Sequence, residues 1–458
     1  MKIFRGTSGI KDTVDPVRLV TSKDTGLTEI AEAINVDIDD SGRISRRAGM
    51  TRIAAGVFHS LFCDGGDCFV ALDSGGSTSI YKVGTNSALT GVRSGMTLAS
   101  RIGWCQVGTK TYYGNGTENG YILAAASYPW AAQTYVGPPT TRTFSAPPVG
   151  THFALLSSRL YVVNGKIVTY SEPLGYGLYD MARARLRFAS NVKMFKPVAG
   201  GIFASDSEKT YFLEGLNPVE FTRRQVLDVP AHEYSEAIGH IDGSLFGLDN
   251  AGMCAVWSCD KGLCVGTATG QVIVATKDKL VYPAGTIGAS LIDGNSVINT
   301  IGGSQCIRTN LRGMASSRYQ SYGFNSLARF NGKLYGAKSD GLYEINTGDT
   351  DNGTVISSSF TLPTSDFGNQ KKKHFRFIYF GGSADGRIKF DLSAEGHDTT
   401  ITKSYTVTFP RTGQQRIRQA ISREIYGRYL TPTLSNVLGS DFSVDEIEIV
   451  SPSAGRAG

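Results

Sequence analysis

Residues 159–170 read Arg-Leu-Tyr-Val-Val-Asn-Gly-Lys-Ile-Val-Thr-Tyr, two apolar runs separated by Asn164-Gly165. An Asn-Gly pair between runs of β-branched and aromatic residues is the strongest short signal of a β-hairpin, because the tight turn needs positive φ angles. The stretch therefore predicts two antiparallel strands joined by a turn at Asn164-Gly165.

Six further segments repeat this unit of a short apolar strand, a turn, and a second strand that is mostly aromatic or β-branched. They lie at residues 68–83, 110–123, 201–213, 244–257, 263–274 and 333–345. A strand-rich period of about 40–50 residues is typical of propeller blades, which stack in a ring because no blade buries its own apolar faces. The repeat predicts an all-β chain with a β-propeller of about six to seven blades over residues 57–350. A β-sandwich or an irregular β array stays open as an alternative, since WD and kelch signatures are absent.

The composition favours the same fold class. The chain of 458 residues contains 55 Gly, 21 Tyr and 22 Phe, and its hydrophobic fraction of 41% is that of a packed protein. Glycine supplies the positive φ of tight turns, and aromatic residues suit a pleated, half-buried surface. These counts indicate many short strands joined by tight turns.

The two ends of the chain differ from the repeats. In residues 1–56 we expect a short helix at Leu27–Asn35, with Ile30, Ala33 and Ile34 on one face, and then a hairpin of Val36–Ile38 with Arg43–Ser45. Residues 353–452 contain seven runs that alternate in the manner of strands, which predicts a small C-terminal β-sandwich. The runs are 356–361, 375–380, 388–392, 405–409, 416–420, 429–434 and 442–449. Residues 453–458 are expected to form a flexible tail.

Charge, cysteines and termini narrow the class of protein. The formal net charge is +6 and the basic residues are scattered, with short runs at 43–47, 183–187 and 371–373. We interpret these runs as solvated surface, with contact to DNA phosphates or an acidic partner as the alternative.

The seven Cys residues do not have the spacing of a zinc site, which predicts reduced thiols. Disulfide bridges across hairpins, Cys63/Cys68 and Cys254/Cys259, are the alternative. The first residues lack an apolar stretch and no run of 18 apolar residues occurs, so we expect no signal peptide, no membrane span and folding in a cytosol.

Catalytic motifs are missing from the sequence. It contains no GxSxG, HExxH, P-loop or strand-associated GxGxxG pattern. Asp37-x-Asp39-x-Ser41-Gly42 begins like a calcium loop, but its twelfth position is Ala48 rather than Glu. Six dispersed His residues have no ligand spacing. We therefore predict no enzyme activity, no catalytic residues, no metal and no cofactor, while a spatially close carboxylate pair stays open.

Three groups of segments resemble virion structural proteins of tailed bacteriophages and prophages. They are residues 33–49, then 170–173 with 209–215 and 217–218, and finally 415–436 with 439–442. In architecture the chain is similar to the tail nozzle, or tail hub, proteins of short-tailed phages, also called packaged-DNA stabilization proteins. The resemblance runs in patches over most of the chain and rests on structural turns and edges.

This resemblance implies a β-propeller body in a ring of identical subunits, typically a hexamer. The ring would lie below the portal and its adaptor proteins in the virion tail, after assembly in the host cytoplasm. It would enclose the channel that retains packaged DNA and passes it on ejection, without binding it specifically. No catalytic residues are implied.

Two groups of charged residues are candidates for contacts in such a ring. A strongly basic channel wall would hold DNA phosphates and slow ejection, so we expect a neutral or acidic wall, with Asp37, Asp39 and Asp40 as channel-facing candidates. The candidates for an inter-subunit or adaptor contact are basic: Lys371, Lys372, Lys373, Arg411, Arg416, Arg418 and Arg423. A propeller lectin or receptor-binding tail-tip protein is the first alternative, and a glycan-degrading tail enzyme is the second.

Overall fold

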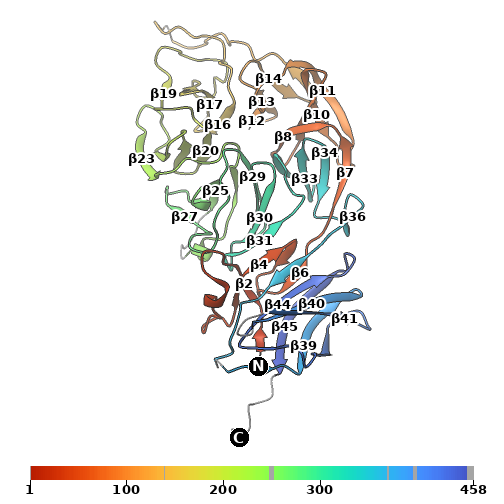
Figure 1. Cartoon of the computed structure of the whole chain (residues 1–458). Helices are drawn as coiled ribbons and strands as arrows, with labels where there is room; N and C mark the ends of the chain where they lie inside the picture. Colours follow the sequence, from red (N-terminus) through yellow and green to blue (C-terminus); the bar gives the residue numbers. More distant parts are fainter. Residues whose placement is uncertain (1, 139, 247–251, 369–370, 396–399, 451–458) are drawn as a thin grey trace.

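The protein is a β-propeller with a β-sandwich beside it (Figure 1). The computed structural model describes residues 2–138, 140–246, 252–368, 371–395 and 400–450. Within these ranges there are strands and two short 3-10 helices, η1 (Pro16–Arg18) and η2 (Gly243–Phe246), but no α-helix. The predicted fold class, a propeller body with a smaller C-terminal sandwich, is confirmed.

Seven four-stranded antiparallel units form the propeller in the part of the chain that the structure describes. Each of the first four blades is formed by four strands that follow one another in the sequence. Blade 1 is β8 (Val57–Cys63), β9 (Cys68–Ser74), β10 (Ser77–Val83) and β11 (Leu89–Thr97). Blade 2 is β12 (Gly103–Val107), β13 (Lys110–Gly114), β14 (Asn119–Leu123) and β15 (Ala126–Tyr128). Blade 3 is β16 (His152–Leu156), β17 (Arg159–Asn164), β18 (Ile167–Tyr170) and β19 (Arg185–Arg187). Blade 4 is β20 (Met194–Val198), β21 (Gly201–Ser205), β22 (Thr210–Glu214) and β23 (Thr222–Leu227).

The last three blades complete the ring. Blade 5 is β24 (Ala237–His240), β25 (Met253–Cys259), β26 (Gly262–Gly266) and β27 (Val272–Val274). Blade 6 is β28 (Gly288–Asp293), β29 (Ser296–Ile301), β30 (Gln305–Asn310) and β31 (Ala315–Tyr319). Blade 7 is β32 (Ser326–Phe330), β33 (Lys333–Lys338), β34 (Gly341–Ile345) and, from the N-terminal segment, β7 (Met50–Ala55), followed by β35 (Thr350–Asp351) and β36 (Thr354–Val355).

The ring is closed by strands from its two ends. β7 pairs antiparallel with β34, with Met50 opposite Ile345 and Ala55 opposite Gly341. A strand that precedes blade 1 thus becomes the outer strand of blade 7. Because this pairing ties residues that are far apart in sequence, the ring cannot open without losing a whole ladder of hydrogen bonds.

Aromatic side chains fill the spaces between neighbouring blades. The Tyr161 and Phe195 rings lie 5.7 Å apart between blades 3 and 4, and Phe203 lies 5.2 Å from Trp257 between blades 4 and 5. Tyr161, Phe195 and Phe203 are all fully buried. Bulky rings suit these spaces because each blade presents a broad apolar face to the next one.

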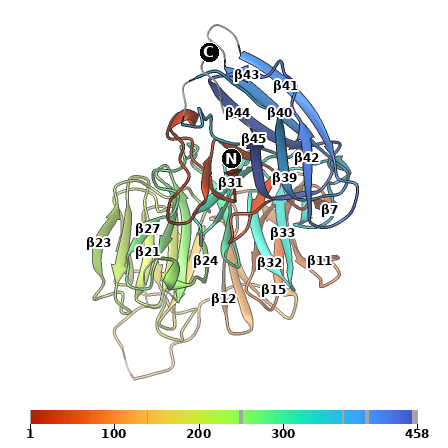
Figure 2. The same ribbon diagram turned by 90° about the horizontal axis from the view of Figure 1, so that it is seen from below.

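The sandwich consists of two sheets that take strands from both ends of the chain. One sheet has the order β42 (Gln415–Ala420), β39 (Phe377–Ala384), β45 (Phe442–Val450), β6 (Ile44–Arg46) and β5 (Val36–Ile38), with β1 (Lys2–Phe4) also on β45. The other has β4 (Glu32–Ile34), β37 (Ser359–Thr361), β44 (Tyr429–Asn436), β40 (Arg387–Glu395) and β41 (Thr400–Thr408). Phe380 and Phe390 meet between the sheets at 4.9 Å. Figure 2 shows this sandwich standing to one side of the propeller.

The N-terminal segment joins the sandwich to the propeller. β4 pairs with β37 of the sandwich on one side and with β31 of blade 6 on the other, so one nine-stranded sheet runs through both parts. A single core cluster likewise extends from sandwich residues such as Phe390 to blade residues such as Val297. The smaller pairs are β2 (Thr7–Ile10) with β3 (Thr28–Ile30), and β38 (Lys373–His374) with β43 (Tyr426–Gly427).

Several sequence predictions need correction. The helix at Leu27–Asn35 is not formed, because β3 pairs with β2 and β4 pairs with β31 and β37, which are distant partners. The first arm of the hairpin at 244–257 is wrong, since Gly243–Phe246 is a 3-10 helix and β25 pairs with β24 instead. The turn after β17 is centred on Gly165-Lys166, one residue later than predicted, with φ of 57° at Gly165. The expected tail at 453–458 lies outside the described residues.

Candidate functional site

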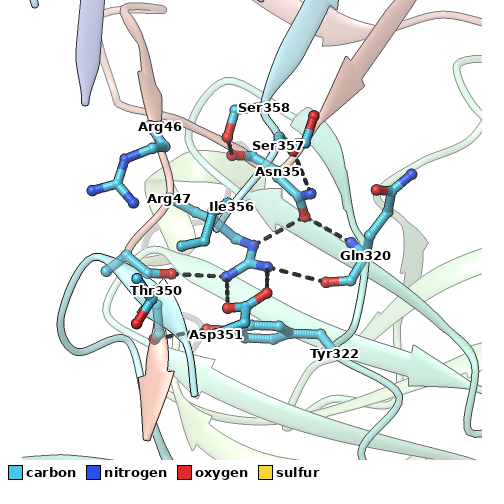
Figure 3. Close-up of polar contacts among 12 residues, drawn as sticks. Asn35, Arg46, Arg47, Gln320, Tyr322, Thr350, Asp351, Ile356, Ser357 and Ser358 are labelled. Atoms are coloured by element: carbon cyan, nitrogen blue, oxygen red, sulfur yellow. Dashed lines mark hydrogen bonds and ion pairs between the residues drawn. The ribbon is translucent and has the colours of Figure 1, made fainter. Parts of the chain in front are cut away.

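Arg47 forms the centre of the junction between propeller and sandwich (Figure 3). Its side chain is 0% exposed, although it lies in the basic run at residues 43–47. The interpretation of that run as solvated surface is therefore wrong for Arg47 and for Arg46, whose side chain is 3% exposed. Charged residues are almost never fully buried unless they are paired, so the contacts of Arg47 define what this junction does.

All five N–H donors of the Arg47 guanidinium have acceptors. Its two terminal nitrogens bind both carboxylate oxygens of Asp351, at 2.8 and 2.5 Å. They also donate to the carbonyl oxygens of Ala48 at 3.0 Å and Gln320 at 3.1 Å, while Nε donates to Asn35 Oδ1 at 3.0 Å. The Tyr322 ring lies 4.4 Å from the guanidinium carbon. A bidentate pair with every remaining donor satisfied is the geometry in which a buried ion pair is stable.

The balance of burial and pairing at Arg47 favours the charged form. Burial alone lowers the pKa of Arg47, but the hydrogen bonds and the charge of Asp351 outweigh it, so its pKa is raised overall. Arg47 therefore stays protonated, and Asp351 has a permanent partner.

Asn35 links the same cluster to the sandwich linker. Its Oδ1 accepts hydrogen bonds from Arg47 and from the Gln320 backbone N–H at 2.8 Å, and its Nδ2 donates to the Ser357 carbonyl at 2.7 Å. Ser358 Oγ donates to the Asn35 carbonyl at 2.8 Å. Asn35 has φ of 53°, a conformation that Asn tolerates better than most residues. The cluster thus holds the N-terminal segment, blade 6 and the linker at residues 351–358 in one arrangement.

The acidic turn expected to face a channel is bound to blade 6. Asp37 Oδ1 lies 3.0 Å from Arg308, and it also accepts a hydrogen bond from the Tyr319 hydroxyl. Asp40 accepts from Asn310 at 2.8 Å and lies 3.2 Å from Arg312, and the hydrogen bond from Asn310 contributes most to its lowered pKa. Asp39 caps its own turn through the Ser41 and Arg43 backbone N–H groups. The contacts of Asp37 and Asp40 attach the β5–β6 hairpin to the propeller, and the exposure of the three carboxylates to a channel stays a prediction.

The basic residues proposed for contacts all lie on the sandwich. Arg416 and Arg418 are exposed on β42, an edge strand, where Arg416 pairs with Glu448 and Arg418 lies 4.9 Å from the Phe377 ring. Arg411 and Arg423 are exposed in the loops before and after β42. Lys373 is in β38, where its Nζ donates to the carbonyls of Lys371 and Arg428, and Lys372 lies 5.8 Å from the Tyr426 ring. The series is therefore divided between the edge strand β42 with its flanking loops and the separate β38–β43 pair.

The sequence predicts no metal site and reduced thiols, with Cys63/Cys68 and Cys254/Cys259 as alternatives for disulfide bridges. Among the described residues no group of three or more His, Cys, Asp or Glu side chains is arranged to hold a metal ion. All seven Cys are free thiols. Cys63 lies opposite Cys68, whereas Cys254 and Cys259 share strand β25 and do not face each other across a hairpin. The neighbour of Cys259 is Cys264, with 3.5 Å between the sulfur atoms.

Comparisons with known proteins identify no function. No protein-family model matches the chain, and no curated protein sequence matches it. Among solved structures, one of BBS1N in complex with ARL6DN matches with 14% identity and a TM-score of 0.40 over 65% of this chain and 96% of that one. The computationally designed Ika8 protein matches with 10% identity and a TM-score of 0.40 over 75% and 98%. A chain of the mitotic checkpoint complex matches with 8% identity and a TM-score of 0.42 over 66% and 93%. No helix among the described residues has the length and apolar character to cross a membrane.

The class of protein is therefore defined by its own strand pairing. It is a seven-bladed β-propeller closed by an N-terminal strand and joined through β4 to a β-sandwich. Sequence reasoning missed the role of Arg47 because its partner Asp351 is 304 residues away. The available signal was the position of Arg47 inside residues 33–49, one of the segments that carry the resemblance to phage virion proteins.

Proposed function

We propose that the chain is a structural subunit of a bacteriophage tail, in a nozzle or hub ring below the portal and adaptor. The observation that carries this proposal is the buried, fully paired Arg47 cluster. Together with the nine-stranded sheet, it makes the propeller and the sandwich one rigid body. A part that is copied around an axis and loaded by packaged DNA needs such rigidity, since symmetric interfaces hold only if each subunit keeps its shape.

Two of the resembling segments support the proposal by their position. Residues 33–49 contain β5, β6, Arg47 and all of β4 except Glu32, and residues 415–436 contain β42, β43 and β44. The segments 33–49 and 439–442 meet in the sandwich, where Arg46 Nε lies 3.4 Å from Asp441. The remaining resembling segments, at 170–173, 209–215 and 217–218, lie in or next to blades 3 and 4.

The edge of the sandwich is the proposed contact with a neighbouring subunit or an adaptor. β42 is an edge strand of its sheet, and edge strands present unpaired backbone groups to partners. Its outward side chains Arg416 and Arg418 add positive charge at this edge. In the ring, genomic DNA would pass the channel without specific binding.

The lectin alternative gains no support from the aromatic residues. A propeller lectin needs exposed Trp or Tyr pockets repeated in each blade, but Trp104, Trp130 and Trp257 are all buried. Trp257 is 0% exposed and packs against Phe203 in the core.

The test is the mass of the purified chain in solution, alone and after mixing with particles of its phage that lack it. We expect either a ring of several copies or a monomer that joins only such particles. A stable monomer that leaves the particles unchanged would overturn the proposal.

The double substitution R416E/R418E then tests the proposed edge. It should weaken ring formation or particle binding by about tenfold or more. Its melting temperature should fall by only a few degrees, because the lost Arg416–Glu448 pair is at the surface and such pairs contribute about 1 kcal/mol or less. The matched control is K166E/K277E, a reversal of two exposed charges on the propeller. Equal assembly of both double variants would exclude β42 as the contact.

A further inference from the structure

A cavity of about 580 Å³ lies on the propeller axis. All seven blades contribute to its lining, through their innermost strands or the loops that precede them. Ligand sites commonly have volumes of about 300–1,000 Å³ and combine apolar walls with a few convergent polar groups. This cavity has both, with walls such as Ile102 and Leu291 and a charged cluster described next.

Arg101 brings a positive charge to this cavity, and the carboxylates of Glu233 and Glu236 partly offset it from beyond ion-pair distance. Its Nη1 donates to the carbonyl oxygens of Asn325 at 2.7 Å and Gly288 at 3.3 Å, so it reaches from blade 2 to blades 6 and 7. Its guanidinium lies 5.0 Å from the Tyr234 ring, which stacks on His152 at 4.9 Å. Within the described residues, no carboxylate forms an ion pair with Arg101. A partly buried cation in this state is unfavourable unless an anion joins it.

Glu236 adds an unsatisfied acceptor to the same cavity. Its side chain is 6% exposed, and Oε1 lies 3.8 Å from Lys196 Nζ, beyond hydrogen-bond distance. Its Oε2 has no hydrogen-bond partner in the described part of the chain. Burial is the largest cause of its raised pKa. Buried polar atoms are normally paired, so Oε2 lacks a partner that the chain itself does not supply.

The charged and unpaired groups of the cavity indicate which chemical class of ligand would bind there. An anion beside Arg101 would supply the close ion-pair partner that it lacks, and a hydroxyl group of the same molecule would satisfy Glu236 Oε2. A neutral sugar leaves Arg101 without a close ion-pair partner, and a simple carboxylate such as acetate leaves Glu236 unpaired. We propose that the axial cavity is a binding site for a small hydroxylated carboxylate, the class of the sugar acids. This site goes beyond the proposed tail function, because it acts within one subunit.

The test uses D-glucuronate as the probe, with D-glucose and acetate as matched comparators. Calorimetry or ligand-observed NMR on the full chain at neutral pH should give a Kd of about 1 mM or tighter for glucuronate. Glucose and acetate should each bind about tenfold or more weakly, because each lacks one of the two interactions. Failure of glucuronate to bind, or equal binding of all three, would overturn the proposal.

Two substitutions locate the binding. Arg101→Met and Glu236→Leu should each weaken glucuronate binding about tenfold or more, since the first removes the cation that pairs with the carboxylate and the second removes the acceptor for the hydroxyl. Lys166→Met and Glu208→Gln are the controls, because both residues are exposed on the propeller surface, and they should bind as the native chain does. If the first two variants bind glucuronate as tightly as the native chain does, the probe binds at another surface. The proposal would then be wrong, and the cavity would hold water only. If a variant does not fold, the three-probe comparison on the native chain decides.

Discussion

The junction and the axial cavity each contain an arginine, fully buried at Arg47 and partly buried at Arg101, but only the junction supplies it with a bound carboxylate. Arg47 has a bidentate carboxylate and an acceptor for every N–H, and its pKa is raised. Arg101 has two carbonyl acceptors and no ion pair among the described residues, and burial, the main cause, lowers its pKa. A fully paired charge serves the structure, whereas an unpaired one is maintained at a cost to stability, which is typical of binding sites.

The largest effect is expected from breaking the junction. Asp351→Ala leaves Arg47 buried without its counterion, so the free energy of unfolding should fall by about 3–5 kcal/mol. Urea denaturation followed by intrinsic fluorescence measures this change. The control is Asp445→Ala, which removes the partner of Arg43 from a pair whose side chains are 38% and 37% exposed. That loss should be about 1 kcal/mol or less. Similar losses in the two variants would refute a special role for the Arg47 cluster.

The next effect concerns His152, which stacks on Tyr234 beside the axial cavity. Burial, and then the charge of Lys196, lowers the pKa of His152 to about 3. Below pH 6.5 the unfolded chain takes up a proton at this residue while the folded chain does not, so stability is lost as the pH falls. Between pH 7 and pH 5 the loss should be about 2 kcal/mol.

His152→Phe measures this contribution, because the ring contact with Tyr234 is kept and the titration is removed. The difference in unfolding free energy between pH 7 and pH 5 should shrink by that amount in the variant. The control is His240→Phe, which changes an exposed histidine. Its unfolding free energy should depend on pH as that of the native chain does. An unchanged slope in His152→Phe would show that the imidazole is already charged in the folded protein.

The sequence predicts local pairing well and distant pairing poorly. The hairpin at 159–170 follows from Asn-Gly chemistry, and the structure pairs β17 with β18 there. Blade 6 was missed although its first turn begins with Asp293-Gly294, because the flanking strands Gly288–Asp293 and Ser296–Ile301 contain no aromatic residue. The failed helix at Leu27–Asn35 has apolar residues at helical spacing, but long-range strand partners overrode that pattern.

The same limit on sequence prediction applies to the junction and to the axial cavity. Neither cluster has a motif, since Arg47 and Asp351, or Arg101 and Tyr234, come together only when the ring closes. Sequence patterns report neighbours along a strand or across a short turn, and both clusters join residues from separate elements. The acidic turn and the basic series were chosen because their charges lie close together in the sequence, but the pairing of Asp37 with Arg308 and of Arg416 with Glu448 was not predictable.

The smallest effect is expected at Arg101, and it sharpens the contrast with Arg47. Arg101→Met removes a cation without a carboxylate partner and leaves only two carbonyl groups without a donor, so the unfolding free energy should change by about 1 kcal/mol or less. Arg47→Met leaves Asp351 unpaired in the junction and should cost about 3–5 kcal/mol. Parallel urea denaturation of the two variants measures the difference. An equally large loss in Arg101→Met would mean that Arg101 is a structural residue, because a cation held for a ligand contributes little to folding until that ligand is bound.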